Sequence, residues 1–218
     1  VFFMGPPLLG MQFGAYPLMK FGDVFDILTP LVLIPLYWML FRINGNTTPS
    51  LRENLVFIII AALWVEGQGM HLAANSIGHL AGAMEDTDIF RLTYFYDEVL
   101  SHYLWHFGIV GLSVLVIYRQ WRNRFIEDMT ASWLPIVSGI IHGFTLFVIV
   151  VEAQTAWLGI PYAVIMTIFG LIWGRKRFRN QPLLLFFFIT GLVAVVLFIG
   201  WGIYWGGLPE FSEVGIID

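Results

Sequence analysis

The sequence from Asn180 to Pro209 reads NQPLLLFFFITGLVAVVLFIGWGIYWGGLP and contains no charged residue. About 20 apolar residues in a helix cross the hydrocarbon core of a bilayer, so this stretch is long enough for one transmembrane span. Two further charge-free runs, Met129–Val151 and Ala153–Gly174, are long enough as well. These three runs indicate a polytopic membrane protein.

Three other apolar segments carry charged residues only near their ends or, in the case of Glu66, within the segment. The predicted spans are about 24–42, 54–79, 97–118, 132–152, 154–174 and 182–205. The predicted fold class is therefore all-α, a polytopic integral membrane bundle of six transmembrane helices, and residues 1–218 are expected to form a single transmembrane domain. The apolar segment Val1–Pro17 is interrupted by several glycines and prolines, so we expect it to be irregular and to lie at the membrane surface or against the bundle.

The composition supports this class and excludes others. Hydrophobic residues make up 58% of the chain and charged residues only 12%, against roughly 25% charged residues in an ordinary soluble domain. The absence of cysteine excludes disulfides, thiolate metal sites and a cysteine nucleophile. A net charge of −4 and the lack of a glycine-rich phosphate loop argue against nucleic-acid or nucleotide binding. The expected surroundings are the lipid bilayer.

The distribution of basic residues predicts the orientation, because short cytoplasmic loops concentrate Lys and Arg. With six alternating spans, one set of loops holds nine of the eleven basic residues: Arg42, Arg52, Arg119, Arg122, Arg124, Arg175, Lys176, Arg177 and Arg179. The opposite side holds most of the acidic residues. We therefore expect an integral multi-pass protein with both ends of this sequence on the extracytoplasmic side.

All five histidines lie in or next to the second, third and fourth spans. In the second span, Gln68, His71, Asn75 and His79 form one polar stripe at 100° per residue. Glu66 points about 140° away from His71 on the same helical wheel. Ionisable groups at membrane depth are costly and usually line an interior site or a cavity, so this stripe is a functional candidate.

The third span places Glu98, His102 and His106 at i, i+4 and i+8, which puts them on one helix face with Ser101 and Asp97 at its border. Two imidazoles one turn apart can hold a single ion, with a carboxylate one turn earlier as a third ligand or as a proton acceptor. In the fourth span, His142 lies near mid-membrane on a face with Ser138 and Thr145. The predicted metal ligands are His71, His102, His106 and His142, and the predicted catalytic residues are Glu98, Glu66 and Ser101.

Purely structural roles are open to several of these residues. His79 lies at a helix end beside an acidic loop and fits a surface position. Asp97 fits a helix cap, because an acidic residue near a helix N-terminus is stabilising. A single His142 also fits a hydrogen-bonded packing position between helices.

The leading functional hypothesis is a membrane-embedded metalloprotein, with the metal-dependent enzyme as its favoured form and its pocket open to the extracytoplasmic side. A divalent ion, zinc first and copper or iron as alternatives, would activate a bound water for a hydrolase or support an oxidoreductase acting on a lipid or small molecule. In its membrane-embedded His, Asp and Ser residues the chain is similar to the multi-pass hydrolases that include alkaline ceramidases and adiponectin-receptor-like proteins. Those families place HxxxH near the last span, whereas His102 and His106 lie on the third span here.

Two further hypotheses use the same histidines. In a proton or metal-ion transporter, the polar stripe would serve as a relay. In a b-haem-binding electron-transfer subunit of a larger membrane complex, His71 or His102 would face His142 across a haem. An absorption spectrum separates the haem hypothesis from the others.

Overall fold

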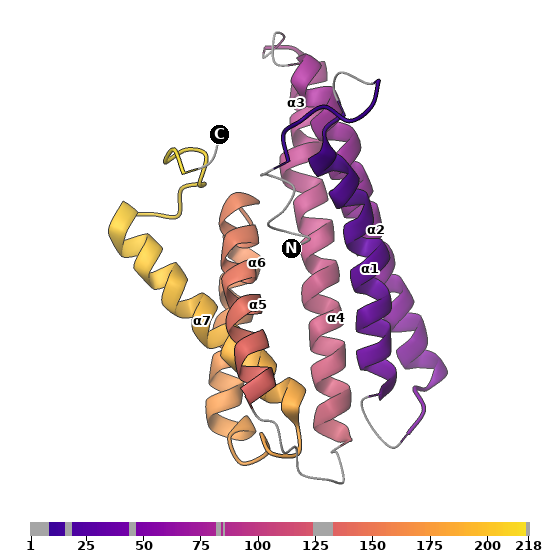
Figure 1. Cartoon of the computed structure of the whole chain (residues 1–218), viewed down its shortest axis with the longest axis vertical. Coiled ribbons are helices and arrows are strands. Elements are labelled where there is room, and N and C mark those ends of the chain that lie inside the picture. Colours follow the sequence, from indigo (N-terminus) through magenta and orange to yellow (C-terminus); the bar gives the residue numbers. More distant parts are fainter. Residues whose placement is uncertain are drawn as a thin grey trace. The chain divides into compact units, whose positions relative to one another are not determined.

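The computed structural model of the protein describes residues 9–15, 19–43, 47–81, 84, 86–123 and 133–216, and for 79–81 it describes the backbone alone. Six long helices are present: α1 Phe21–Ile43, α2 Leu51–Ala81, α4 His102–Arg122, α5 Trp133–Glu152, α6 Ala156–Phe169 and α7 Pro182–Trp205 (Figure 1). The short helix α3, Asp88–Tyr94, and the π-helical turn η3, Phe95–Ser101, lead directly into α4, while the π-helical turn η4, Gly170–Gly174, extends α6. Among the described residues there is no strand, so the all-α prediction is confirmed.

Within the described part of the chain, six helical segments are long and apolar enough to cross a membrane: Phe21–Ile43, Leu51–Gly78, Asp88–Arg122, Trp133–Glu152, Ala156–Gly174 and Pro182–Trp205. Large apolar side chains on these helices point outward, and Leu31, Ile165 and Ile203 are more than half exposed. Such surfaces suit lipid rather than water. The chain is therefore an integral multi-pass membrane protein.

The third span is the one whose start differs most from the prediction. It begins at Asp88 rather than near residue 97, because Thr87 provides the N-cap, its hydroxyl accepting a hydrogen bond from the backbone NH of Phe90 at 3.3 Å. Asp97 does not cap the helix. It is buried, and its carboxylate contacts a histidine of α2, so the acidic residue lies inside the helical segment.

Only part of the predicted irregular segment Val1–Pro17 lies within the described residues. Leu9–Ala15 has no helix and contains Gly14 in the left-handed region at φ 64°. Gln12 forms an isolated antiparallel bridge with Lys20. Residues 1–8 and 16–17 lie outside the described part of the chain.

The chain divides into two compact units. Unit 1 comprises Val1–Leu36 and Val56–Ile109, and unit 2 comprises Tyr37–Leu55 and Val110–Asp218. Helices α1, α2 and α4 each contribute residues to both units. The two units are described separately below.

Unit 1 depends on a close crossing of α2 and α4. A β-carbon on residue 67 would lie 2.6 Å from the carbonyl oxygen of Ser101, and one on residue 108 would lie 2.6 Å from Cβ of Trp64. No other residue type fits at either position without moving backbone or a tryptophan, so Gly67 and Gly108 allow the two helices to approach each other. This approach brings the polar residues of α2 against those at the start of α4.

Unit 2 is built on α7, which packs against both α5 and α6. Gly139 and Gly143 of α5 lie against Ile189 and Val193 of α7, and Gly191 of α7 lies against the carbonyl oxygen of Ala163 in α6. These small residues let the three helices pack backbone to side chain, as small residues do in many transmembrane bundles. The interior of this part is almost wholly apolar.

Two polar connections join the loop end of α4 to neighbouring segments within unit 2. Buried Arg119 donates hydrogen bonds to the carbonyl oxygens of Phe41 at 2.9 Å and Thr47 at 2.8 Å, and to Oε1 of Glu53 at 3.0 Å. Buried Gln181, just before α7, donates from Nε2 to the carbonyl oxygen of Gln120 at 2.7 Å. We call these three contacts of Arg119 the arginine clasp.

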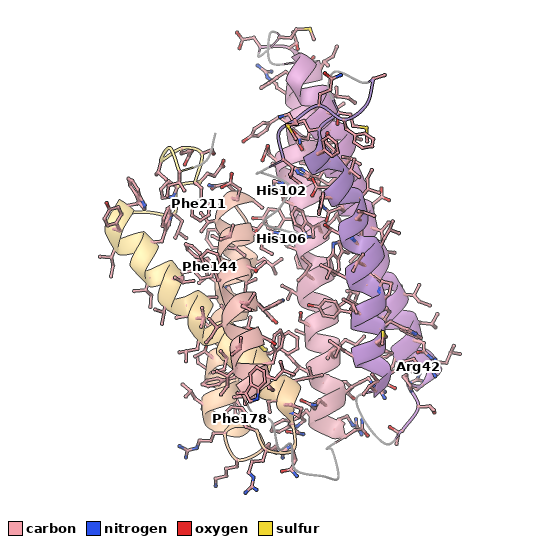
Figure 2. The ribbon with its side chains drawn as sticks, in the orientation of Figure 1. Arg42, His102, His106, Phe144, Phe178 and Phe211 are labelled. Carbon is pink, nitrogen blue, oxygen red and sulfur yellow. The ribbon has the colours of Figure 1, made fainter. Side chains whose placement is uncertain are left out.

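At the other end of α7, the segment Gly206–Ile216 turns back on the helix. Phe211 packs against Phe147 and Trp201, with ring centroids 5.8 and 4.8 Å apart (Figure 2). Its backbone NH donates to Oε2 of Glu152 at 3.0 Å, and Nε1 of Trp201 donates to the carbonyl oxygen of Pro209 at 3.1 Å. The segment is thus held to α5 and α7.

Candidate functional site

Three histidines lie next to one another in unit 1, and we call His71, His102 and His106 the histidine row. The ring centroids of His71 on α2 and His102 on α4 are 4.8 Å apart, and those of His102 and His106 are 6.5 Å apart with an interplanar angle of 14°. Figure 2 shows His102 and His106 on successive turns of α4. Both are buried, at 5% and 3% exposure, and His71 is partly buried. The predicted common face of His102 and His106 is present, with His71 beside it.

Trp105 closes one side of the histidine row. Its ring centroid lies 6.0 Å from that of His71, 5.8 Å from that of His102 and 4.7 Å from that of His106. The indole is itself buried. This apolar wall covers one side of the three imidazoles, and burial of this kind is expected for ionisable residues within a span.

Asp97 lies next to the histidine row, in contact with His71. Its Oδ1 lies 2.8 Å from Nδ1 of His71. Asp97 belongs to the π-helical turn η3, where the extra residue per turn places both Asp97 and Ser101 on the buried side. Ser101 donates its hydroxyl proton to the carbonyl oxygen of Asp97, one turn earlier. The carboxylate, His71, His102 and His106 therefore follow one another in space.

A second polar contact links α2 to α1 in the same unit. Nε2 of Gln68 donates to Oδ1 of Asp26 at 3.3 Å, and Oε1 of Gln68 accepts from Nε1 of Trp64 at 3.3 Å. Gln68 and Trp64 are both buried. Asp26 was not among the predicted site residues, because its spacing of three residues from Asp23 near a helix start gave no sign of a contact with α2.

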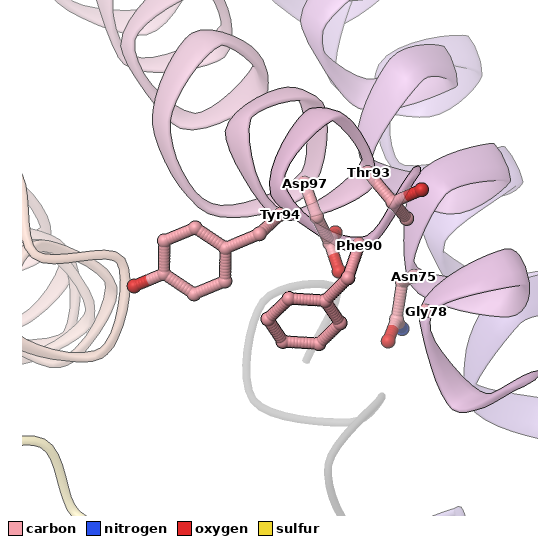
Figure 3. A pocket seen from close by; sticks show the side chains of 6 residues that line it. All are labelled: Asn75, Gly78, Phe90, Thr93, Tyr94 and Asp97. Atoms are coloured by element: carbon pink, nitrogen blue, oxygen red, sulfur yellow. The ribbon is translucent and has the colours of Figure 1, made fainter. Parts of the chain in front are cut away.

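A pocket opens beside Asp97. Its volume is about 200 Å³, and its lining residues come from α2, α3 and η3: Asn75, Gly78, Phe90, Thr93, Tyr94 and Asp97 (Figure 3). A β-carbon on residue 78 would lie 3.7 Å from Oδ2 of Asp97, so this oxygen faces the pocket side of α2 while Oδ1 contacts His71. Asp97 is thus shared between the pocket and the histidine row.

The other predicted site residues lie in different surroundings. Oε2 of Glu98 is 3.8 Å from Nδ1 of His102, so this carboxylate stands beside the histidine row. Glu66 is exposed, in keeping with its predicted orientation away from His71. The backbone of residue 79 continues α2, but the side chain of His79 lies outside the described residues.

His142 belongs to unit 2, whereas the histidine row belongs to unit 1. Its ring centroid lies 5.1 Å from that of Phe186 and 6.2 Å from that of Phe187, both on α7. These contacts fit the packing role that the sequence left open for it. Across the described residues, no three His, Asp or Glu side chains are arranged to hold one metal ion. The four-histidine metal site stays a prediction.

The fold and this buried polar row define a class: a multi-pass helical membrane protein with histidines and a carboxylate inside one of its units. Among known proteins the chain is similar to the ceroid-lipofuscinosis neuronal protein 6 homolog of the dog, Canis lupus familiaris. The two are 24% identical over 218 aligned positions, which cover 85% of this chain and 66% of that protein, so the chain spans slightly less than two thirds of its length.

No protein-family model matches the chain, and no solved structure matches it.

Proposed function

We propose that the chain is a proton-transferring membrane protein in which Asp97 and the histidine row form the path for the proton. The observation that carries this proposal is the 2.8 Å contact between Oδ1 of Asp97 and Nδ1 of His71, followed by the imidazoles of His102 and His106. Histidine is the side chain whose unperturbed pKa lies closest to neutral, so it accepts and releases protons under physiological conditions. Chains of Asp and His inside membrane spans are typical of proton relays.

The surroundings of the histidine row support this role. Trp105 covers it, and the crossing at Gly67 holds α2 close enough to α4 for their imidazoles to be neighbours. Asp97 lines the pocket at one end, and a proton from the pocket reaches His71 through a direct contact. The carboxylate of Glu98 stands 3.8 Å from Nδ1 of His102, beside the next imidazole of the path.

The test is proton flux in vesicles. The purified chain is reconstituted into liposomes carrying a pH-sensitive dye, and a pH step is applied with valinomycin and potassium to clamp the membrane potential. We expect flux above that of empty liposomes, and a loss of about 100-fold in His71→Gln and His102→Gln, since each removes a proton-carrying group from the path. His142→Gln is the matched control, because it removes a histidine from unit 2, and it should keep wild-type flux.

Flux equal to that of empty liposomes would overturn the proposal. Flux that survives both His71→Gln and His102→Gln would place the proton path elsewhere and would overturn it equally.

Metal-dependent catalysis is the second candidate, and one observation favours it. A carboxylate that holds one ring nitrogen of a histidine is the usual orienting partner of a metal-binding imidazole, and Asp97 stands in this relation to His71. His71, His102 and His106 would then supply imidazole ligands for zinc, with copper or iron as alternatives, and Glu98 would act as a base on a lipid or small-molecule substrate. Elemental analysis of the purified chain tests this candidate: stoichiometric metal that is lost in His102→Ala supports it, and its absence after zinc titration refutes it.

We also propose that the basic loops lie in the cytoplasm, with both ends of this sequence on the opposite side. The arginine clasp joins segments 41–53 and 119, and Gln181 joins the start of α7 to Gln120, so within unit 2 the basic stretches gather at one end. Impermeant thiol reagents test the orientation in a chain that has no cysteine of its own. Asp86→Cys should react in intact cells and Lys176→Cys only after permeabilisation; the reverse result would mean an inverted topology.

A further inference from the structure

The pocket beside Asp97 combines features that the proton path does not require. Of the six described residues that line it, one is a carboxylate, two are aromatic, and none is basic. Phe90 and Tyr94 stack with ring centroids 6.3 Å apart and an interplanar angle of 26°. Figure 3 shows the two rings with Asp97 on one side of the pocket and Asn75 and Gly78 on the other. We infer that this pocket binds the alkylammonium group of an organic cation.

The aromatic rings and the carboxylate favour the same kind of ligand. The face of an aromatic ring attracts a cation, and aromatic residues around a site are a recurrent means of recognising methylated ammonium groups. Oδ2 of Asp97 faces the pocket and supplies the negative charge. An anion would meet that carboxylate with no lining basic group to offset it, and a neutral ligand would gain nothing from the charge.

The size and polarity of the pocket also limit the class of ligand that it can bind. About 200 Å³ is several times the roughly 30 Å³ share of a water molecule in the liquid, so the pocket accepts a small organic group rather than a bare ion. Metal ions such as calcium or magnesium require several oxygen ligands, whereas the described residues of the lining include one carboxylate. The Asn75 amide and the Thr93 hydroxyl can hydrogen-bond a polar part of the same ligand.

The position of the pocket allows two sources of a ligand with an alkylammonium group. The pocket is lined by the last turns of α2 and by α3 and η3, which lead into α4, so it lies toward one end of these spans. A free cation such as choline and the headgroup of phosphatidylcholine both present a trimethylammonium group there. The ligand chemistry is the same in both cases, and the experiment separates the sources.

Binding is measured by calorimetry on the purified full chain in nanodiscs of phosphatidylglycerol, a lipid without an ammonium group. Choline is the probe, and 3,3-dimethyl-1-butanol is the ligand control, because it has the shape of choline without its charge. We expect choline to bind and the neutral alcohol not to bind. Equal heats from the two ligands, or no heat from choline, would overturn the inference.

Variants test the location of binding. Gly78→Leu fills the pocket and should abolish binding; the matched control Gly69→Leu makes the same change on α2 where a new side chain meets open space, and it should bind as wild type does. Phe90→Leu keeps an apolar side chain but removes the ring, so affinity should fall about 2- to 30-fold. In Asp97→Asn, the affinity for choline should fall at least as far. Binding that is unaffected by all of these variants would refute the pocket as the site.

A second set of nanodiscs made of phosphatidylcholine identifies the source. If the lipid headgroup occupies the pocket, the choline signal disappears in these discs; if a free cation is the ligand, the signal persists. All binding measurements are made at a single pH, without a pH gradient, so they do not depend on proton transfer. A chain that binds choline without moving protons, or moves protons without binding choline, would refute one proposal and leave the other standing.

Discussion

The two units of this chain use their transmembrane helices in opposite ways. In unit 1, helices α2 and α4 approach at Gly67 and Gly108, and the space beside the crossing holds three imidazoles and a carboxylate. In unit 2, helices α5, α6 and α7 approach at glycines as well, but the neighbouring side chains are Ile189, Val193 and Val150. The same means of close packing thus supports polar contacts at the crossing of α2 and α4 and apolar contacts among α5, α6 and α7.

This contrast shows which polar residues call for a functional explanation. Packing in a bilayer needs only small residues and apolar neighbours, as α5 and α7 demonstrate. The histidine row is therefore not needed for helix association, and its burial costs free energy that packing alone would not require. The ring of His142 lies beside those of Phe186 and Phe187 on α7, and it shows that a single histidine can be accommodated by apolar packing.

The largest expected effect comes from breaking the helix crossing of unit 1. Gly67→Leu forces a side chain into the backbone of α4 near Ser101 and should destabilise the fold by about 3 kcal/mol or more, because neither helix can move aside without losing the crossing. The unfolding midpoint in a detergent titration measures this loss.

Gly69→Leu is the control two residues along the same helix. Position 69 is exposed and has open space around it, so the substitution should be neutral or stabilising by up to about 1 kcal/mol through helix propensity. Equal destabilisation by the two variants would mean that the crossing at Gly67 is not what holds α2 to α4.

The sequence predicted the spans and the helix faces well, because both follow from local properties. Charge-free runs set the span limits, and a spacing of four residues puts His102 and His106 on one face. His71 could be assigned to a polar stripe from its own helix alone. The sequence grouped His71 with His102 as ligands of one site, but the direct contact of their rings depends on where two glycines on different helices meet.

The missed features arise from departures from regular helix geometry and from tertiary contacts. The third span starts at Asp88 because Thr87 caps it, and Asp97 and Ser101, expected at the border of the histidine face, are buried in a π-helical turn. Arg119 was counted with the basic loops, yet it is 1% exposed, since its partners come from the end of α1 and the start of α2. Nothing near Arg119 in the sequence distinguishes it from Arg122.

The arginine clasp buries a charged side chain in unit 2. In this respect unit 2 resembles unit 1, where Asp97 is buried. Arg119→Met removes the partner of Glu53 and of two backbone carbonyls, and should destabilise the chain by about 3 kcal/mol. Arg119→Lys should rescue little of this loss, because Nε and the two terminal nitrogens of the arginine each serve a different acceptor, and an ammonium cannot reproduce that fork.

The matched control is Arg122→Met, one turn further along α4. Arg122 is exposed and donates to the hydroxyl of Tyr118 at 2.9 Å, and exposed contacts of this kind contribute little, so the change should stay within about 0.5 kcal/mol. Thermal unfolding in detergent ranks the three variants. If Arg119→Met were as mild as Arg122→Met, the clasp would not contribute to stability.

The smallest effect concerns the acidic groups at the other end of unit 2. Burial raises the pKa of Glu210, and the nearby charges of Glu213 add to this, while hydrogen bonds from Ser212 and Gln154 oppose it. A carboxyl whose pKa is higher in the docked state than in the free state binds its proton more tightly when docked. Docking of segment 206–216 is therefore favoured at low pH and weakens as the pH rises from the ordinary value of 4.5 through the raised pKa.

Glu213→Gln tests this directly, because it removes the charge that repels Glu210 and keeps the side chain's shape. Protection of the Phe211 NH, which donates to Glu152, is measured by hydrogen exchange, with variant and wild type compared at each pH so that the intrinsic pH dependence of exchange cancels. The variant should be better protected above the carboxyl range and equal to wild type below it, by a small margin because these side chains are largely exposed. Protection that does not differ between the two at any pH would mean that the acidic groups have no part in holding this segment, and that its attachment rests on the packing of Phe211 against Phe147 and Trp201.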